Sequence, residues 1–287
     1  MTERREEIQR LIKETRSLPT LPGIVSKMSA LVENDKTSIQ EIARLVSSDQ
    51  ILSAKVLKLV NSPFYGFPGR VSTVSNALIL LGVNVVKGLA LSASIFEMME
   101  KNVVGLWEHS LGTAAAASVI AKRIGAPEAE EISTAALLHD IGKVIVKIKF
   151  EEDFKHFESR VREKAISMYE AERESLGADH AEIGGWLAKS GYLPDKLIEP
   201  IACHHDVEKS TQHPLKTAIV HLADILVKAD GFGFSGDDLV PQIQPAAWKK
   251  LGLKEAQLEE IVDEIGEKLI DVKNLSLEIQ APHDAPA

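Results

Sequence analysis

The chain has 287 residues, of which 45% are hydrophobic and 26% charged, the composition of a globular protein with room for two modest domains. Its net charge of −9 is uneven: residues 1–105 hold 13 basic and 10 acidic groups, whereas residues 106–287 hold 20 and 32. The sequence has no basic stripe, which argues against nucleic-acid binding. We identify no apolar run as a membrane span, which argues against membrane association. The charged start is no signal peptide, and the single Cys203 fits a reducing compartment, so we predict a cytoplasmic protein.

Helical periodicity runs through residues 1–105, which we predict to form an N-terminal helical lobe. Ser38 and Glu41 have the spacing of a capping box, and Asp49 is predicted to cap the next helix. Gly82 is predicted to hinge two helices. The turn-rich loop 61–69 carries Phe64, Tyr65 and Phe67, which would be either an exposed partner surface or, as we favour, a clamp between lobes. The predicted helices begin near residues 8, 24, 38, 49, 74 and 83.

Residues 106–273 form the second predicted lobe, which is rich in alanine and histidine. Its predicted helices cover about 107–125, 129–141, 151–173, 178–190, 194–204, 214–229 and 245–273. The last residues, 274–287, contain two prolines and are predicted to be a flexible tail. No segment has a convincing strand pattern, so the predicted fold class is all-α.

The pair His139-Asp140 follows the apolar run Ala-Ala-Leu-Leu and therefore lies at the edge of the core. Buried polar side chains need partners, and a metal ion would serve both residues. The alternative for this pair alone is a buried hydrogen-bonded couple. Imidazole nitrogen with carboxylate oxygen suits Fe or Mn, with Zn, Ni or Mg as alternatives.

Other residues of the same kinds lie between apolar neighbours on separate predicted helices. Seven ligands are too many for one tetrahedral metal site and suit two ions, with Asp140 as the bridging carboxylate. For His204-His205 the alternative is a helix C-terminus, and for Asp224 a cap or a salt bridge. The predicted metal ligands are His109, His139, Asp140, His180, His204, His205 and Asp224, in which His109, His139 and Asp224 complete one ion and His180, His204 and His205 the other.

The order of these motifs resembles the HD superfamily of metal-dependent phosphohydrolases and, more closely, the HDOD family. The segments that carry this resemblance are Leu18–Pro22, Asp49–Ser62 and Ala77–Gly82. The resemblance implies an all-α HD-type fold with an additional N-terminal helical lobe. It also implies a role in bacterial signalling, often without demonstrable catalysis.

The predicted ligands further resemble those of HD-GYP phosphodiesterases, and Lys143 matches the lysine of their His-Asp-x-Gly-Lys motif. The chain departs from that family after His205, where Asp206 replaces a glutamate and no Gly-Tyr-Pro follows. Gly105 stands where members with three metals have glutamate, which implies two metals. Asp206 is expected to orient His205, and His221 is expected to support the site or to be structural.

Two functions remain open from the sequence. One is a metal-binding signalling protein that contacts other signalling proteins. The other is a phosphohydrolase or phosphodiesterase for a nucleotide ligand such as a cyclic dinucleotide. In the second, the ions and Asp140 would activate water, and Lys143 would bind the phosphate oxygens; the alternative for Lys143 is a solvated lysine.

Overall fold

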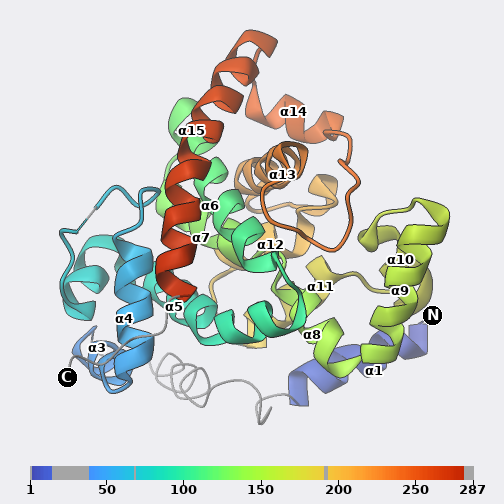
Figure 1. Ribbon diagram of the computed structural model, residues 1–287, viewed down its shortest axis with the longest axis horizontal. Helices are drawn as coiled ribbons and strands as arrows, with labels where there is room; N and C mark the ends of the chain where they lie inside the picture. Colours follow the sequence, from blue (N-terminus) through green and yellow to red (C-terminus); the bar gives the residue numbers. More distant parts are fainter. Residues whose placement is uncertain (1, 15–38, 68, 191–192, 281–287) are drawn as a thin grey trace.

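A computed structural model describes residues 2–14, 39–67, 69–190 and 193–280. Within these ranges the secondary structure is helical and contains no strand, which confirms the predicted all-α fold (Figure 1). The predicted helix near residues 24–32, the capping residue Ser38 and the segment Leu18–Pro22 lie outside the described residues.

The first half contains α1 (Thr2–Glu14), α3 (Ile39–Ser47), α4 (Gln50–Val60) and α5 (Val74–Asn102). Asp49 caps α4 as predicted, because its carboxylate accepts a hydrogen bond from the backbone N–H of Leu52 at 2.9 Å. The predicted hinge at Gly82 is also confirmed. This glycine has φ 80° inside α5, a conformation that a residue with a Cβ adopts only with strain.

The expectation that no segment is apolar enough to span a membrane was wrong for α5. Residues Val74–Phe96 are long and apolar enough by composition. In the structure, however, 61% of this segment is buried inside the protein, and it is kinked at Gly82. These features fit the core helix of a globular domain better than a membrane span.

The second half contains α6 (Leu106–Arg123), α7 (Ala129–Leu138), α8 (Ile141–Lys149), α9 (Glu151–Lys164), α10 (Met168–Leu176), α11 (His180–Ser190), α12 (Asp195–Cys203), α13 (Pro214–Asp230), α14 (Pro245–Leu251) and α15 (Glu255–Gln280). Several predicted bounds were wrong. The helix predicted over 245–273 is two helices, because α14 ends at Leu251 and α15 begins at Glu255. The helix predicted to reach 141 ends at Leu138, and α8 follows it. The helix predicted over 151–173 is two helices, since Ala165 has φ 51° and Ser167 caps α10. The helix predicted to end at 273 continues to Gln280, so the first residues of the predicted tail at 274–287 are helical.

Helix α6 lies at the centre of the second half and packs against α7, α13 and α15 (Figure 1). It is buried on nearly every side because its middle is the small-residue run Thr113–Ser118, which lets neighbouring helices approach from several directions. This burial places residues near the start of α6, including His109, deep inside the protein.

Helix α1 lies at one end of the molecule, whereas α3 and α4 lie at the other (Figure 1). It packs on α11, where Arg5 forms a bidentate ion pair with Glu182 at 2.7 and 2.9 Å. The division into lobes near residue 105 stays a prediction, although α1 lies against the second predicted lobe.

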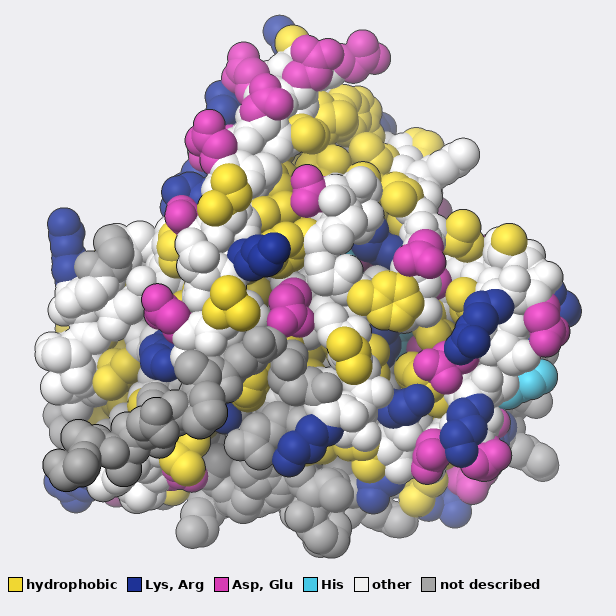
Figure 2. All heavy atoms as spheres, viewed as in Figure 1, with side chains coloured by type: hydrophobic (Ala, Val, Ile, Leu, Met, Phe, Trp, Pro, Cys, Tyr) yellow, Lys and Arg dark blue, Asp and Glu magenta, His cyan; other side chains and the backbone are white. Residues whose placement is uncertain are grey.

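The acidic charge of the second half gathers on the surface. Figure 2 shows acidic side chains crowded over the end of α15 at the top of the view. This helix alone contains Glu255, Glu259, Glu260, Asp263, Glu264 and Glu267 within its first half. The excess of carboxylates is therefore mostly solvated, and the buried centre is built from other residues.

Candidate metal centre

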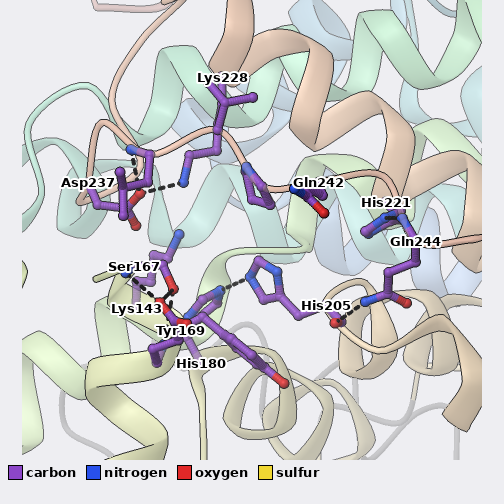
Figure 3. A pocket seen from close by; sticks show the side chains of 14 residues that line it. Lys143, Ser167, Tyr169, His180, His205, His221, Lys228, Asp237, Gln242 and Gln244 are labelled. Carbon is purple, nitrogen blue, oxygen red and sulfur yellow. Dashed lines mark hydrogen bonds and ion pairs between the residues drawn. The ribbon is translucent and has the colours of Figure 1, made fainter. Parts of the chain in front are cut away.

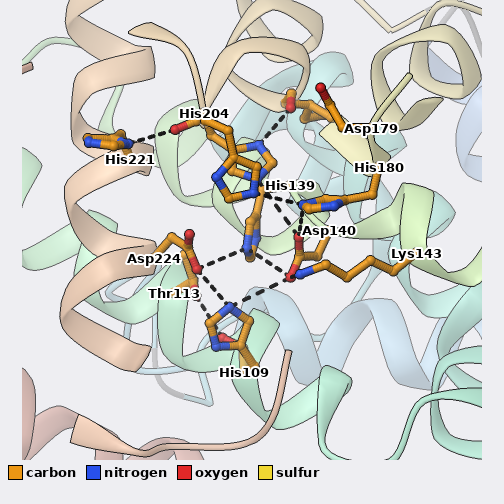
Figure 4. Close-up of polar contacts among 12 residues, drawn as sticks. His109, Thr113, His139, Asp140, Lys143, Asp179, His180, His204, His221 and Asp224 are labelled. Atoms are coloured by element: carbon orange, nitrogen blue, oxygen red, sulfur yellow. Dashed lines mark hydrogen bonds and ion pairs between the residues drawn. The ribbon is translucent and has the colours of Figure 1, made fainter. Parts of the chain in front are cut away.

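The seven predicted ligands converge on one place in the protein, and Figure 4 labels all of them except His205. Helix α6 carries His109, the break between α7 and α8 carries His139 and Asp140, and α11 begins at His180. The end of α12 supplies His204 and His205, and α13 supplies Asp224. All except His205 are at most 3% exposed.

The ligand atoms form two groups, in each of which they lie within 4.8 Å of one another. One group is His109, His139 and Asp224; the other is Asp140, His180, His204 and His205. This division matches the predicted one, with Asp140 next to both groups. Its Oδ2 lies 3.3 Å from His139 Nε2, and its Oδ1 lies 3.1 Å from His180 Nε2.

Breaks between helices leave these side chains free to point inward. Asp140 occupies the N-cap position of α8, yet its carboxylate makes no capping hydrogen bond. His139 and His204 occupy the C-cap positions of α7 and α12. Three of the seven candidate ligands therefore lie at positions where a helix begins or ends.

Several ligand atoms are buried without a hydrogen-bond partner among the residues that the structure describes. They are Nε2 of His139, Nε2 of His204 and Oδ1 of Asp140. Buried polar atoms are nearly always satisfied in proteins, so a cluster of unsatisfied polar atoms needs an additional partner. The atoms are imidazole nitrogens and a carboxylate oxygen, which are the atoms that bind divalent metal ions.

The imidazoles also crowd one another. His180 Nε2 and His205 Nε2 are 2.8 Å apart, and the ring centroids of His204 and His205 are 4.1 Å apart. Burial, together with the neighbouring imidazoles, holds the pKa of His204 and of His205 well below the usual value. Neutral imidazoles with converging nitrogen lone pairs favour a cation between them.

The carboxylates of the centre are ionised. Burial would raise the pKa of Asp140, but His139, Lys143 and His180 hold it well below the usual value. Burial lowers the pKa of His139, and the carboxylates of Asp140 and Asp224 outweigh this effect and raise it to about 9. The cluster thus combines two anionic carboxylates with five imidazoles, a donor set that fits a pair of divalent ions.

Glu172 contacts the candidate ligand His180, a contact that the sequence did not indicate. It is fully buried in α10, and its Oε2 accepts hydrogen bonds from Nδ1 of His180 at 2.6 Å and from the backbone N–H of His180 at 2.8 Å. A carboxylate behind a ligand histidine sets its tautomer and orientation. No local sequence feature separates Glu172 from the solvated glutamates around it.

His221 lies beside the paired histidines, and its ring makes two hydrogen bonds. Its Nδ1–H donates to the carbonyl oxygen of His204 at 2.7 Å, and its Nε2 accepts from the backbone N–H of Gln244 at 3.1 Å. Both ring nitrogens are therefore used, which agrees with the expected supporting role. The side-chain amide of Gln244 donates to the carbonyl oxygen of His205, so the paired histidines are held from both sides.

Lys143 contacts the candidate metal ligand Asp140, whereas Asp206 contacts a lysine outside the cluster. Lys143 is 3% exposed, and its ammonium lies 2.6 Å from Asp140 Oδ2, so it is no solvated lysine. The carboxylate of Asp206 pairs with Lys209 at 3.1 Å instead of contacting the ring of His205. The orienting role expected for Asp206 is therefore absent from this geometry.

A pocket of about 360 Å³ adjoins the centre at His180 and His205 (Figure 3). Lys143, Lys228 and Asp237 lie at one end of it, and His221 and Gln244 at the other. The remaining lining residues are Ser167, Tyr169, Glu170, Leu239, Val240, Pro241 and Gln242. A small molecule in this pocket would contact the side of the centre that carries the second ligand group.

The fold and the site together define a class of protein, an all-helical protein with a buried histidine–aspartate cluster suited to metal ions. A family model described as the HDOD domain matches residues 18–207. Since this match covers well over half of the chain, the chain belongs to the HDOD family, as the sequence motifs predicted.

Known proteins resemble the chain over most of its length. The crystal structure of an HDOD domain protein of unknown function from Geobacter sulfurreducens is 29% identical, with a TM-score of 0.68 over 94% of this chain and 98% of that one. That of a candidate signal transduction protein from Marinobacter aquaeolei is 22% identical, with a TM-score of 0.71 over 94% of this chain and 61% of that one. An uncharacterized protein of Treponema pallidum is 27% identical over 194 residues, which make up 66% of this chain, and the match spans 38% of that protein's length.

Proposed function

We propose that the chain is a metal-binding HDOD signalling protein whose buried cluster holds two divalent ions. The observation that carries the proposal is the set of unsatisfied inward-facing atoms on His139, His204 and Asp140. His109, His139 and Asp224 would hold one ion, and His180, His204 and His205 the other, with Asp140 between them. Fe or Mn suits this mixture of nitrogen and oxygen ligands best, with Zn, Ni or Mg as alternatives.

The proposed signalling role depends on the helices that the two ions would hold together. The ligands come from α6, the α7–α8 break, α11, α12 and α13, so a bound pair would tie together most of the second half of the chain. Gain or loss of the ions would change how firmly these elements hold one another. A partner protein in the cytoplasm can recognise such a change, and other signalling proteins are the partners that we propose.

The second candidate function is a metal-dependent phosphohydrolase or phosphodiesterase acting on a nucleotide. The pocket beside His180 and His205, with the buried ammonium of Lys143 in its lining, favours it. Bound divalent ions supply Lewis acidity toward a phosphate ester and lower the pKa of water. Lys143 would hold phosphate oxygens of the nucleotide. His221 is a poor proton donor for the leaving oxygen, because both of its ring nitrogens are already bonded.

Elemental analysis of the purified protein, with anomalous scattering at the metal edges of a crystal, tests the proposal. We expect about two ions per chain in the wild type and none in Asp140→Ala, because the lost carboxylate contacts both ligand groups. Asp206→Ala is the matched control, since it removes a nearby carboxylate that pairs with Lys209, and it should keep both ions. Two ions retained by Asp140→Ala would refute the bridging assignment.

Turnover assays separate the two functions. Cyclic di-GMP, its linear product and a generic phosphodiester are offered to protein loaded with Mn or Fe. No hydrolysis at full metal occupancy favours the signalling protein. Hydrolysis that disappears in Asp140→Ala and persists in Asp206→Ala favours the phosphohydrolase.

A further inference from the structure

The segment 231–244, which we call the strap, joins α13 to α14 and lies beyond the residues that the HDOD family model matches. Gly233 packs directly on the backbone of His109, where a Cβ would come within 2.3 Å of the amide nitrogen. At its other end, Gln244 bonds to His205 and His221. The strap is thus attached at both ends to residues of the candidate metal centre.

Asp237 fixes the middle of the strap. Its carboxylate accepts hydrogen bonds from the backbone N–H groups of Met168 at 2.9 Å and Leu239 at 3.0 Å. It also pairs with the ammonium of Lys228 at 2.9 Å. Asp237 is 6% exposed, so this arrangement is buried and directs Lys228 into the end of the pocket.

Two lysines share that end of the pocket. Figure 3 shows the side chains of Lys143 and Lys228 on the same side as Asp237, away from Gln244. Their side chains are only 4% and 8% exposed. Two buried ammonium groups at one end of a cavity form a strongly positive site unless carboxylates neutralise both.

The available carboxylates neutralise both lysines only while the centre lacks its ions. Lys143 is paired with Asp140, the carboxylate that the proposed ions would share. With the ions in place, Asp237 is left to balance both ammonium groups. Glu170, the other carboxylate in the lining, is bonded to the backbone N–H and hydroxyl of Ser167. Among the described residues Asp140 is the carboxylate paired with Lys143 and Asp237 the one paired with Lys228, so Lys143 would lose its direct partner to the ions.

We propose that Lys143 and Lys228 form an anion subsite that binds a second phosphate group of a ligand whose first phosphate lies on the metal pair. The inference rests on the proposed dinuclear centre and narrows its ligand to small molecules with two phosphate groups. Asp237 tunes the subsite, because its carboxylate positions Lys228 and also competes with the incoming anion.

The test uses probes that differ only in the second phosphate. Bisphosphates of ethanediol, propanediol and butanediol are titrated calorimetrically into metal-loaded protein, with propyl phosphate as the reference, and the metal content is measured after each titration. We expect at least one bisphosphate to bind about tenfold more tightly than propyl phosphate, since hydrogen bonds to a charged group are stronger than neutral ones.

Two substitutions with opposite expected effects separate binding from structure. Lys228→Gln should weaken bisphosphate binding about tenfold and leave propyl phosphate binding nearly unchanged. Asp237→Asn keeps an oxygen for one of the two backbone N–H groups and removes the competing charge, so it should strengthen bisphosphate binding. Lys149→Gln, which removes an exposed charge from α8, controls for net charge.

Equal binding of every bisphosphate and propyl phosphate to protein that holds two ions would overturn the subsite alone. Weakening of both probes to the same extent by Lys228→Gln and Asp237→Asn would also overturn it, because a structural role of the pair predicts that result. A protein that binds no ions would instead refute the dinuclear centre on which the subsite rests.

Discussion

His139 and His204 each end a helix and each donate their Nδ1–H to the backbone carbonyl three residues earlier, at 2.7 and 2.8 Å. The carbonyl is one that the helix end leaves without a partner, so the histidine caps its helix. The same bond keeps a proton on Nδ1, so Nε2 is the nitrogen that faces the centre and can bind a metal once any proton on it is lost. The sequence analysis treats capping a helix and binding a metal as alternatives for His204. One side chain can do both, because each role uses a different ring nitrogen.

Glu172→Gln tests the residue that holds His180. Glutamine is a weaker acceptor for the imidazole N–H than a carboxylate is, so we expect metal affinity to fall about 10- to 100-fold. Competition with a chelator of known affinity measures the change. Glu174→Gln is the control. Glu174 lies on α10, as Glu172 does, but it is exposed and pairs with Arg160 of α9. Equal affinities for both variants would contradict the supporting role of Glu172.

Metal binding should release protons. Burial lowers the pKa of His139 and of His180, but nearby carboxylates outweigh it, Asp140 for the first and Glu172 for the second, and raise both to about 9. Both imidazoles therefore carry a proton at pH 7 without metal, and a metal ion must displace it. We expect about two protons released per chain at pH 7. Affinity should fall as the pH drops below 9 and level off above it.

Calorimetry in buffers with different ionisation enthalpies measures this release. The apparent binding enthalpy should vary with the buffer at pH 7 and hardly at all at pH 10. An affinity that is the same at pH 7 and pH 9 would contradict the raised pKa values.

At the scale of helices, α8 and α11 touch through their backbones. A Cβ on Gly142, in the first turn of α8, would come within 1.9 Å of the carbonyl oxygen of His180 and 2.8 Å of the amide nitrogen of Gly184. Only glycine permits this approach, and the approach brings His180 within 3.1 Å of Asp140. The glycine of the His-Asp-Ile-Gly-Lys segment therefore has a packing role that acts directly on the centre.

Gly142→Ala should separate α8 from α11. Overpacking of a buried contact typically costs about 1–3 kcal/mol, and we expect a loss of stability in that range together with loss of metal from the His180 side. Gly266→Ala is the control on α15, where an added Cβ meets nothing within 4 Å. It should stabilise the protein by up to about 1 kcal/mol through helix propensity. Thermal unfolding and metal content measure both effects, and a fully metallated, stable Gly142→Ala would contradict the argument.

For the whole molecule, the two predicted lobes share one continuous hydrophobic core. The clamp between lobes at Phe64, Tyr65 and Phe67 stays a prediction, although Phe64 and Tyr65 contact the second half: Ser118 of α6 donates to the carbonyl oxygen of Phe64 at 2.9 Å. Tyr65 contacts Thr134 of α7 at 2.7 Å. Thr134 donates its own proton to the carbonyl of Glu130, so the tyrosine hydroxyl is the donor in this pair.

The shared core predicts that both lobes unfold in one transition, which circular dichroism and tryptophan fluorescence should follow with the same midpoint. Tyr65→Phe should lower the free energy of unfolding by about 1 kcal/mol, because a buried hydrogen bond is lost. Tyr169→Phe, whose hydroxyl bonds to the exposed Arg173, should change it little. Two separate transitions would mean that the lobes are independent units.

Much of this architecture follows from local chemistry. Periodic apolar residues predict nearly all of the described helices, and the cap at Asp49 and the kink at Gly82 follow from single residues. Helix α8 was missed because Val144, Ile145, Val146 and Ile148 are β-branched and Gly142 disfavours helix. Burial of residues 141–146 overrides that weak preference, and burial is a tertiary property.

The sequence by itself determined the family and which imidazoles and carboxylates were candidates for the centre, because the HDOD and HD motifs consist of those residue types in a set order. Only the tertiary structure decided how they are held and what lies beside them. Glu172, Gln244 and the pair Lys228–Asp237 acquire their roles from contacts between segments that are distant or unremarkable in sequence. A glutamate on a charged helix looks the same whether it faces water or a histidine, and packing alone distinguishes the two.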